Sequence, residues 1–195
     1  MNRLLVIGTP LVLASATPAQ AQFSFTEQTD LLSEGSLSGA PMAVVDMNGD
    51  GRDDLIRLHE TERLLIDYQE GPGEPFSSYV YGEVPRGSIW AVCAADVDRN
   101  GFNDLFLGPS SGGAFLLKAN ATGASYALVG LPDRDIFVQG SIFADFNNDG
   151  NVDIFACDDN DDNHRYRNDG TGGFLLEPGL VGDSLPSSVS SGNYA

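Results

Sequence analysis

The chain has 195 residues, of which 28 are acidic and 10 basic, so its formal net charge at pH 7 is −18. Such a charge argues against nucleic acid and anionic membrane surfaces as partners. Two cysteines, Cys93 and Cys157, are too few for a disulfide scaffold, and they leave open either two buried thiols or one disulfide.

The first 21 residues have the composition of a secretory signal peptide. A basic start at Arg3 precedes an apolar run over residues 4–14, and Ala19-Gln20-Ala21 fits a small-x-small cleavage site. The run is too short to span a membrane, and no later stretch is apolar enough to do so. We therefore expect a signal peptide over residues 1–21, no membrane span, and export to the extracellular space or the periplasm.

The rest of the chain alternates short apolar runs with turns rich in Gly and Pro, and no stretch has convincing helical periodicity. Short runs of this kind indicate β-strands. In chain order, the predicted strands cover residues 41–45, 55–58, 62–68, 76–81, 87–92, 105–107, 114–118, 126–129, 140–144, 154–156, 165–168 and 174–176.

An acidic pattern separates the first two strands of each group of four. It begins at Asp46, Asp96 and Asp145, so successive copies are 50 and 49 residues apart. In each copy, oxygen-bearing side chains occupy positions 1, 3, 5 and 9, and Gly occupies position 6. The near-equal spacing indicates a repeat array.

The pattern suits a hard cation, since Ca²⁺ takes about six to eight oxygen ligands. Alternate side chains of a curled loop point inward, and Gly at position 6 reaches positive φ without steric penalty. We expect about three Ca²⁺ ions, one per loop, with the position-7 residue contributing its backbone carbonyl. The predicted ligands are Asp46, Asn48, Asp50, Arg52 and Asp54, then Asp96, Asp98, Asn100, Phe102 and Asp104, then Asp145, Asn147, Asp149, Asn151 and Asp153.

Two features separate these loops from EF-hand and dockerin loops. Position 12 is Arg57, Leu107 or Ala156 where an EF-hand has Glu, and the residues that follow read as a strand and not as a helix. The alternative to a metal site is a solvated acidic turn.

The strands and loops define three units, with boundaries near 41–86, 87–139 and 140–190. Units of this length with four strands are typical of propeller blades. Residues 140–144 echo residues 87–91, and residues 191–195 have a similar order, which predicts the start of a fourth unit. We therefore expect an all-β fold, a partial β-propeller of about three four-stranded blades in an open arc, truncated from a longer propeller that supplies the remaining blades.

The loops, the Asp-Leu or Asp-Ile that ends each of them, and the segment Tyr166-Arg167-Asn168-Asp169-Gly170-Thr171-Gly172-Gly173-Phe174 resemble FG-GAP/VCBS-type repeats. These are the propeller repeats of integrin α-chain heads and of many secreted bacterial proteins. The resemblance covers roughly residues 41–195. It implies that the aspartate loops join neighbouring strands of a blade and bind Ca²⁺, but it implies no single function.

Several other residues have a functional and a structural interpretation. Ser184 lies in an esterase-like Gly-Asp-Ser-Leu tetrapeptide, but no His follows it, so we interpret the segment as a turn. We expect His59 at the surface end of a strand. The acidic run over residues 158–163, just before His164, predicts a solvated hairpin tip, with an additional cation site as the alternative.

Two further features of the second unit have open interpretations. We expect Trp90 to pack in the core, and a sugar-stacking platform is the alternative. Asn120-Ala121-Thr122 is an N-glycosylation sequon, which matters only in a eukaryotic secretory route.

No catalytic set stands out among the many carboxylates. The sequence therefore predicts a secreted, calcium-binding, non-catalytic propeller module for adhesion or for binding a protein or glycan ligand. One alternative is the scaffold of a secreted polysaccharide-degrading enzyme, which rests on analogy between folds. The other is a purely structural spacer.

Overall fold

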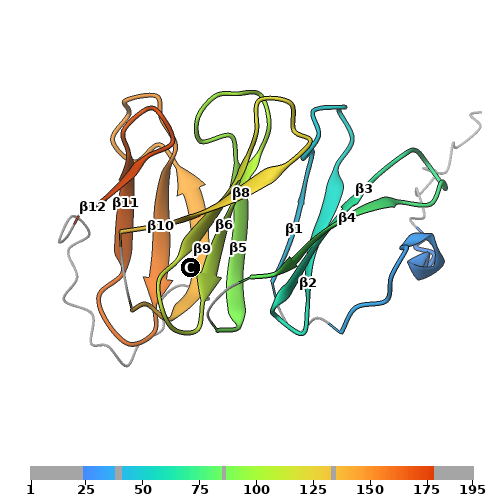
Figure 1. The fold of residues 1–195 in the computed structure, drawn as a ribbon, viewed down its shortest axis with the longest axis horizontal. Coiled ribbons are helices and arrows are strands. Elements are labelled where there is room, and N and C mark those ends of the chain that lie inside the picture. The colour runs from blue at the N-terminus through green and yellow to red at the C-terminus, as the bar shows by residue number, and fades with distance from the viewer. Residues whose placement is uncertain (1–23, 38–40, 85–86, 133–134, 178–195) are drawn as a thin grey trace, which may run out of the picture.

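The computed structural model describes residues 24–37, 41–84, 87–132 and 135–177 (Figure 1). The predicted signal peptide, the tetrapeptide with Ser184, and the expected start of a fourth unit at residues 191–195 lie outside the described residues. One short 3₁₀ helix, Thr29–Leu31, precedes the strands. Within the described ranges, no helix combines the length and apolarity needed to cross a membrane.

The strands of the described residues form three four-stranded antiparallel sheets, each made of consecutive strands. Every predicted strand is present, with ends that differ by a few residues. The first sheet contains β1 (Met42–Val45), β2 (Asp54–His59), β3 (Arg63–Tyr68) and β4 (Ser77–Glu83), the second β5 (Ile89–Ala95), β6 (Asp104–Pro109), β7 (Phe115–Ala119) and β8 (Tyr126–Gly130), and the third β9 (Val138–Ala144), β10 (Asp153–Asp158), β11 (His164–Asn168) and β12 (Phe174–Glu177).

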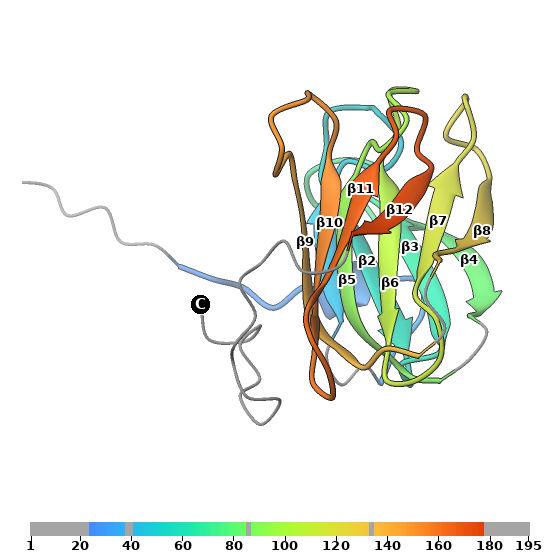
Figure 2. The same cartoon turned by 90° about the vertical axis from the view of Figure 1, so that its left-hand side faces the viewer.

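The three sheets stand side by side as blades (Figures 1 and 2). In each sheet the strands follow chain order from one edge to the other. The first strands of the blades are neighbours, because β5 contacts both β1 and β9. This arrangement confirms the predicted all-β fold, a partial propeller of three blades in an open arc.

Two apolar cores join the blades. Between the first and second blades, Ile56 and Leu58 pack with Leu105 and Leu107. Between the second and third blades, Phe106 and Leu116 pack with Ile154 and Tyr166. Successive residues of β6 therefore enter different cores, which explains why this strand is apolar at successive positions.

At the two ends of the arc, apolar side chains remain exposed. Met42 and Val44 lie on β1, and Ile142 and Leu175 lie on the third blade. The faces that carry them correspond to the faces through which blades pack against each other in the middle of the arc. Their exposure fits an arc of three blades and not a closed ring.

The strand register corrects the proposed echo between residues 87–91 and 140–144. Ala95 pairs with Asp104, and Ala144 pairs with Asp153, so Ala144 is equivalent to Ala95 and not to Ala91. In all three blades the aspartate that ends the loop pairs with the residue just before the loop, and β5 runs beyond its predicted end at residue 92. The sequence echo was therefore out of register.

Candidate metal centre

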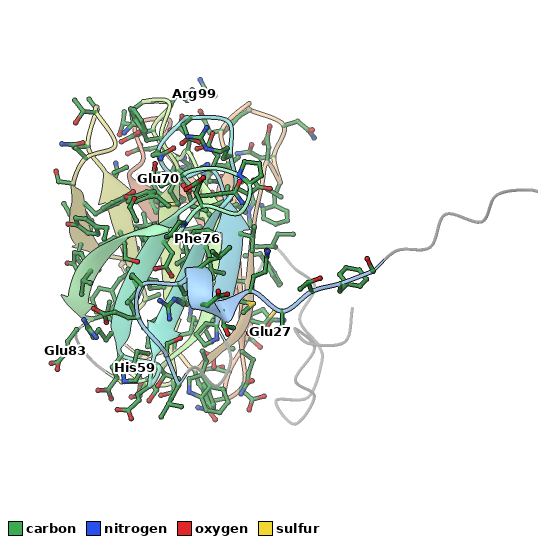
Figure 3. All side chains as sticks on the ribbon, turned by 90° about the vertical axis from the view of Figure 1, so that its right-hand side faces the viewer. Glu27, His59, Glu70, Phe76, Glu83 and Arg99 are labelled. Atoms are coloured by element: carbon green, nitrogen blue, oxygen red, sulfur yellow. The ribbon has the colours of Figure 1, made fainter. Side chains whose placement is uncertain are left out.

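The three acidic loops connect the first and second strands of their blades, β1–β2, β5–β6 and β9–β10, and so lie at the same end of the sheets (Figure 1). Arg99 marks this end in Figure 3, and His59 lies at the opposite end. The array of loops at one end follows directly from the repeat of the sequence. It places the predicted ligands of all three blades on one side of the molecule.

The position-1 aspartate organises each loop by accepting backbone N–H groups. Asp46 Oδ1 accepts from Gly49 N at 2.7 Å, and Oδ2 accepts from Gly51 N at 2.8 Å. Asp96 and Asp145 accept the corresponding position-6 N–H, also at 2.8 Å. These hydrogen bonds alone curl the chain around the carboxylate.

The position-6 glycines adopt the conformation that the sequence predicted. Gly51, Gly101 and Gly150 have φ of +82°, +92° and +86°. Position 4 is left-handed as well, and there Arg99 and Asn148 have φ of +59° and +57° without being glycine. A non-glycine residue in this region is uncommon, with Asn enriched and Arg not.

The position-9 aspartates are fully buried and join each loop to its blade. Asp54 accepts the N–H of Met47 at 2.8 Å through one oxygen and that of Gln69 at 2.9 Å through the other. Asp104 accepts the N–H of Val97 and Ala119 in the same way, at 2.9 and 2.8 Å. Sequence reasoning treated these residues only as ligands and missed this structural role.

The third member of this set has one different partner. Asp153 accepts the N–H of Asn168 at 2.9 Å, and its second oxygen lies 3.3 Å from Arg165 Nη2. A carboxylate offers about four lone-pair positions on its two oxygens, so these contacts leave acceptor capacity. Ligation of an ion by the position-9 residues stays a prediction.

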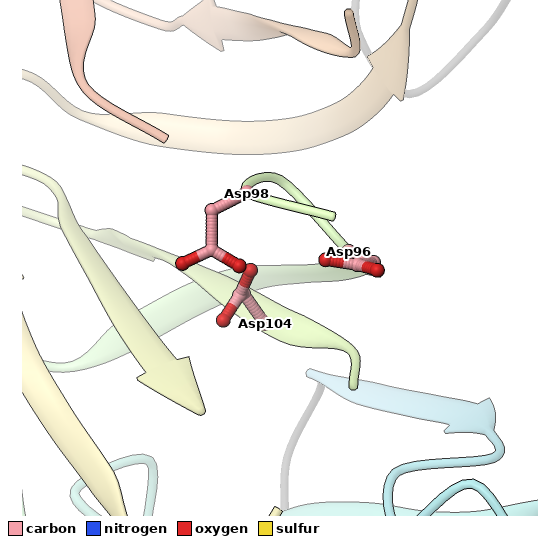
Figure 4. Close-up of side chains that lie close together, drawn as sticks. All are labelled: Asp96, Asp98 and Asp104. Carbon is pink, nitrogen blue, oxygen red and sulfur yellow. The ribbon is translucent and has the colours of Figure 1, made fainter. Parts of the chain in front are cut away.

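The second loop brings three carboxylates together. Oxygen atoms of Asp96, Asp98 and Asp104 all lie within 4.8 Å of one another, the one such group of His, Cys, Asp or Glu among the described residues (Figure 4). Asp98 Oδ2 lies 3.1 Å from Lys118 Nζ. Asp98 Oδ1 is buried and has no hydrogen-bond partner. An unsatisfied buried acceptor costs about 1–3 kcal/mol, so the loop offers an oxygen that a cation would satisfy.

In the first and third loops, the position-5 aspartates contact donor side chains of their own loops. Asp50 lies 2.6 Å from Arg52 Nη2, and Asp149 accepts a 2.8 Å hydrogen bond from Asn147 Nδ2. Both carboxylates are thus directed toward donors of their own loop. These donors compete with an ion for the position-5 oxygens in these two loops.

Position 5 of the second loop is an asparagine with a structural role. Asn100 donates from Nδ2 to the carbonyl of Ala119 at 3.0 Å, and its Oδ1 accepts the N–H of Phe102 at 2.9 Å. In the other two loops as well, the position-7 N–H, that of Arg52 or Asn151, donates a hydrogen bond to the position-5 side chain. Ligation by the position-7 carbonyls stays a prediction.

The carboxylates of the loops differ in pKa because their surroundings differ. Burial raises the pKa of Asp104 to about 6, against the effect of its two backbone hydrogen bonds, and the nearby Asp98 carboxylate adds to the increase. Burial likewise raises the pKa of Asp54. The backbone N–H groups of Arg52 and Asn151 lower the pKa of the exposed Asp50 and Asp149, respectively.

Contacts between blades connect the loops to one another, and sequence reasoning did not find them. Arg99 Nη2 donates to the carbonyl of Gly150 and, at 2.8 Å, to Asn151 Oδ1 in the third loop. The buried Asn168 donates from Nδ2 to the carbonyl of Val97 in the second loop at 2.8 Å. Asn168 belongs to the segment 166–174 that carries the family resemblance. This resemblance was the one feature of the sequence that pointed to Asn168.

Position 12 of the first loop confirms the distinction from an EF-hand. Arg57 is buried in β2 and forms an ion pair with Asp67 on the neighbouring strand β3. In an EF-hand this position supplies a bidentate Glu from the following helix. Here it contributes to sheet packing.

The remaining candidates have structural surroundings. Cys93 and Cys157 are free thiols, which resolves the open choice against a disulfide, and burial raises the pKa of Cys93 to about 12. His59 ends β2 as predicted, where its Nδ1 accepts the N–H of Leu37 at 3.0 Å. His164 begins β11, with Nε2 3.8 Å from the buried Asp158.

The expectation that Trp90 packs in the core was wrong, because the residue is 43% exposed. Its ring and that of Phe137 form a T-shaped pair. Asn120 is exposed in the β7–β8 turn, where its Oδ1 accepts the N–H of Thr122 at 3.1 Å. Glycosylation of Asn120 stays a prediction.

Neither a protein-family model nor a curated protein sequence matches this chain. Thirteen solved chains match by structure. One is the crystal structure of BBS1N in complex with ARL6DN, soaked with lead, with a TM-score of 0.39 and 16% sequence identity over 75% of this chain. The match spans about half (55%) of that chain. The class of the present protein, an all-β partial propeller with acidic loops at one end, therefore rests on its own sheet topology.

Proposed function

We propose that this chain is a secreted, calcium-stabilised propeller module of the FG-GAP/VCBS type, which binds a protein or carbohydrate ligand and carries no catalysis. The observation that supports it most strongly is the group formed by Asp96, Asp98 and Asp104, in which one oxygen of Asp98 is buried and unpaired. A divalent cation would satisfy that oxygen and offset the mutual repulsion of three carboxylates.

The residues present fit a hard cation, because the loops offer carboxylate, amide and carbonyl oxygens and no thiol or imidazole. The side chains at positions 1, 3, 5 and 9 would hold the ion, together with the position-7 carbonyl. When bound, the ion supplies positive charge and cross-links the loop. In the first loop, ligation by Asp50 competes with its exposed ion pair to Arg52, which is a weak interaction because solvent screens it.

A binding role suits a row of blades whose loops are fixed by ions, because repeat arrays present extended surfaces to partners. Export is supported by the signal-peptide composition of residues 1–21. Extracellular calcium-binding modules have dissociation constants of roughly 10⁻⁴–10⁻³ M, so even weak sites would be filled outside the cell.

Thermal unfolding with and without Ca²⁺ tests this proposal. Each occupied site adds about 2.7 kcal/mol when free Ca²⁺ is a hundredfold above Kd. For a chain of this size, 1 kcal/mol raises Tm by about 2–4 °C. We expect millimolar Ca²⁺ to raise Tm by at least several degrees over EDTA, and equal Mg²⁺ to have a smaller effect.

Asp98→Asn is the matched variant for this test, because it keeps the shape of the side chain and removes one charge. We expect it to reduce the Ca²⁺-dependent shift and to leave Tm in EDTA similar or higher. Identical melting curves in EDTA and in millimolar Ca²⁺ would contradict the proposal.

A further inference from the structure

Trp90 occupies a β-bulge in the first strand of the second blade. Ile89 pairs with Pro109 and Ala91 pairs with Gly108, which leaves Trp90 as the extra residue. Across this bulge the chain changes faces, since Ile89 enters the core between the first two blades and Ala91 the core between the second and third. A bulge redirects the side chain of its extra residue, and here that side chain is directed to solvent.

The bulge itself does not require tryptophan. The third blade has the same irregularity, with Asp158 opposite Val138 and Cys157 opposite Gly140, so that Gln139 is the extra residue. In the third blade, a polar residue therefore occupies the position that corresponds to Trp90. The bulge can form with a polar side chain. Trp90 is 43% exposed, so part of this large aromatic residue stays outside the packing of the fold and is accessible to a ligand.

Trp90 contacts Phe137, and Phe137 is one of the residues that line a polar cavity. The rings of Trp90 and Phe137 pack edge to face, with centroids 5.4 Å apart and an interplanar angle of 88°. Phe137 also lines a cavity of about 200 Å³ between the β6–β7 turn and the β10–β11 loop. Figure 1 shows that this turn and loop lie at the end of the sheets opposite the three acidic loops.

The walls of the cavity combine hydroxyl, amide and carboxylate groups. Ser110, Ser111, Asn160 and Asp161 lie among the lining residues, with Phe137 as an apolar element. Serine and asparagine side chains both donate and accept hydrogen bonds, whereas an ionised carboxylate only accepts. The volume of the cavity is below the range of roughly 300–1,000 Å³ that is common for drug-sized ligands. A cavity of this size favours a ligand with a single small polar ring.

The loop that carries Asn160 and Asp161 is anchored to this site. The buried Asp158 accepts the N–H of Phe137 at 3.3 Å and that of Asn160 at 2.9 Å. Asp159 N donates to the carbonyl of Phe137 at 2.9 Å. The backbone of Phe137 and the polar wall are therefore held together by hydrogen bonds to the Asp158 carboxylate and between the two backbones.

We propose that Trp90, Phe137 and this cavity bind a carbohydrate without acidic groups. The inference rests on the proposed function as a binding module and names its ligand class. An exposed indole offers a flat apolar surface for the C–H face of a sugar ring. Hydroxyl groups of the sugar donate to Asp161 and exchange hydrogen bonds with Asn160 and Ser111. The carboxylates of the wall repel uronic acids and sulfated sugars.

Intrinsic fluorescence tests this site directly, since Trp90 is the only tryptophan of the chain. The full chain in millimolar Ca²⁺ is titrated with galactose, glucose, mannose, N-acetylglucosamine and their disaccharides. We expect a saturable change in Trp90 emission with at least one of them, and binding of galacturonic acid at least tenfold weaker than that of galactose if galactose is the sugar bound. For another sugar, its own uronic acid is the matched probe.

Three variants separate the contributions, with binding followed by calorimetry. Trp90→Ala is expected to weaken binding at least tenfold, Trp90→Phe less than that, and Asp161→Asn severalfold. The control is Val129→Ala, because Val129 on β8 of the same blade is also 43% exposed but has no aromatic ring to pack on Phe137 or to stack on a sugar. If Trp90→Ala fails to fold, the other two variants still decide the question.

The outcomes distinguish this inference from the proposed function. No saturable response to any of these sugars, in a chain whose Tm still rises with Ca²⁺, overturns the sugar site and leaves the calcium module intact. Unchanged affinity in Trp90→Ala also overturns the site, as does preference for the uronic acid. Loss of the Ca²⁺ effect on Tm contradicts the proposed function, whatever the sugars do.

Discussion

Asn103 in the second acidic loop donates a 2.7 Å hydrogen bond from Nδ2 to the backbone carbonyl of Asp46, the first residue of the first loop. This contact joins neighbouring blades at the residue where the first loop begins. Asp46 itself accepts three N–H groups of its loop through its carboxylate. The position of one predicted ligand is therefore fixed in part by the next blade.

We predict that Asn103→Ala lowers the free energy of unfolding by about 1 kcal/mol, the usual net value of one hydrogen bond. Chemical denaturation in Ca²⁺ measures the change. Gln69→Ala is the control, because within the described residues the side-chain amide of Gln69 makes no hydrogen bond. Equal losses of stability in the two variants would show that the link to Asp46 contributes nothing.

A second prediction concerns Arg99, which links the second loop to the third. Arg99→Asn removes the guanidinium and introduces a residue type that tolerates the left-handed conformation, as Asn148 does in the third loop. Because Arg99 donates to Gly150 and Asn151, we expect the variant to weaken Ca²⁺ binding at the third loop severalfold. Calorimetric titration compares the two proteins, and an unchanged isotherm would contradict the coupling.

A third prediction concerns Lys118, whose Nζ lies 3.1 Å from Asp98 and 3.4 Å from the carbonyl of Gly172. The ammonium group partly neutralises the second loop and opposes the entry of a cation. We expect Lys118→Met, which keeps the length and the apolar part of the side chain, to raise Ca²⁺ affinity at this loop about tenfold. Lower affinity in the variant would mean that Lys118 serves mainly to hold the loop in shape.

The strands and loop positions could be predicted because both depend on local sequence. A short apolar run that follows Asp54, Asp104 or Asp153 pairs with the strand before the loop, and glycine at position 6 marks the turn. What could not be predicted depends on neighbours distant in sequence. The bulge at Trp90 arises from pairing with Pro109 and Gly108, and no local pattern indicates it.

Side-chain links between blades were unpredictable for the same reason. Asn103 and Arg99 occupy loop positions that have no repeated residue type, since the other loops have Asp53 and Val152 at position 8, and Gly49 and Asn148 at position 4. The position-9 aspartates were found, but as ligands only. Their backbone partners Gln69, Ala119 and Asn168 lie 15 residues further along the chain.

The pH dependence of the calcium-free protein follows from Asp104. Burial raises its pKa in the folded state to about 6, from an ordinary 3.8, so the folded state binds this proton more tightly than the unfolded chain. The stability that this group contributes is therefore fully present below pH 3.8 and is lost as pH rises through about 6.

We predict that, in EDTA, the Tm of the native chain rises relative to that of Asp104→Asn as pH falls from about 7.5 to about 5. The difference corresponds to about 1–3 kcal/mol. In Ca²⁺ the proton competes with the ion, so affinity at the second loop falls over the same interval. A Tm difference that does not change with pH would show that Asp104 has no role in either effect.

Calorimetric titration of the calcium-free chain with Ca²⁺ tests the central claim most directly, because it counts the sites. The proposal predicts about three ions per chain in the micromolar-to-millimolar range, and about one fewer in Asp149→Ala, which alters the third loop alone. Asp169→Ala is the control, since Asp169 is an exposed aspartate outside the loops. Absence of binding in this range, or a stoichiometry that Asp149→Ala leaves unchanged, would contradict the account.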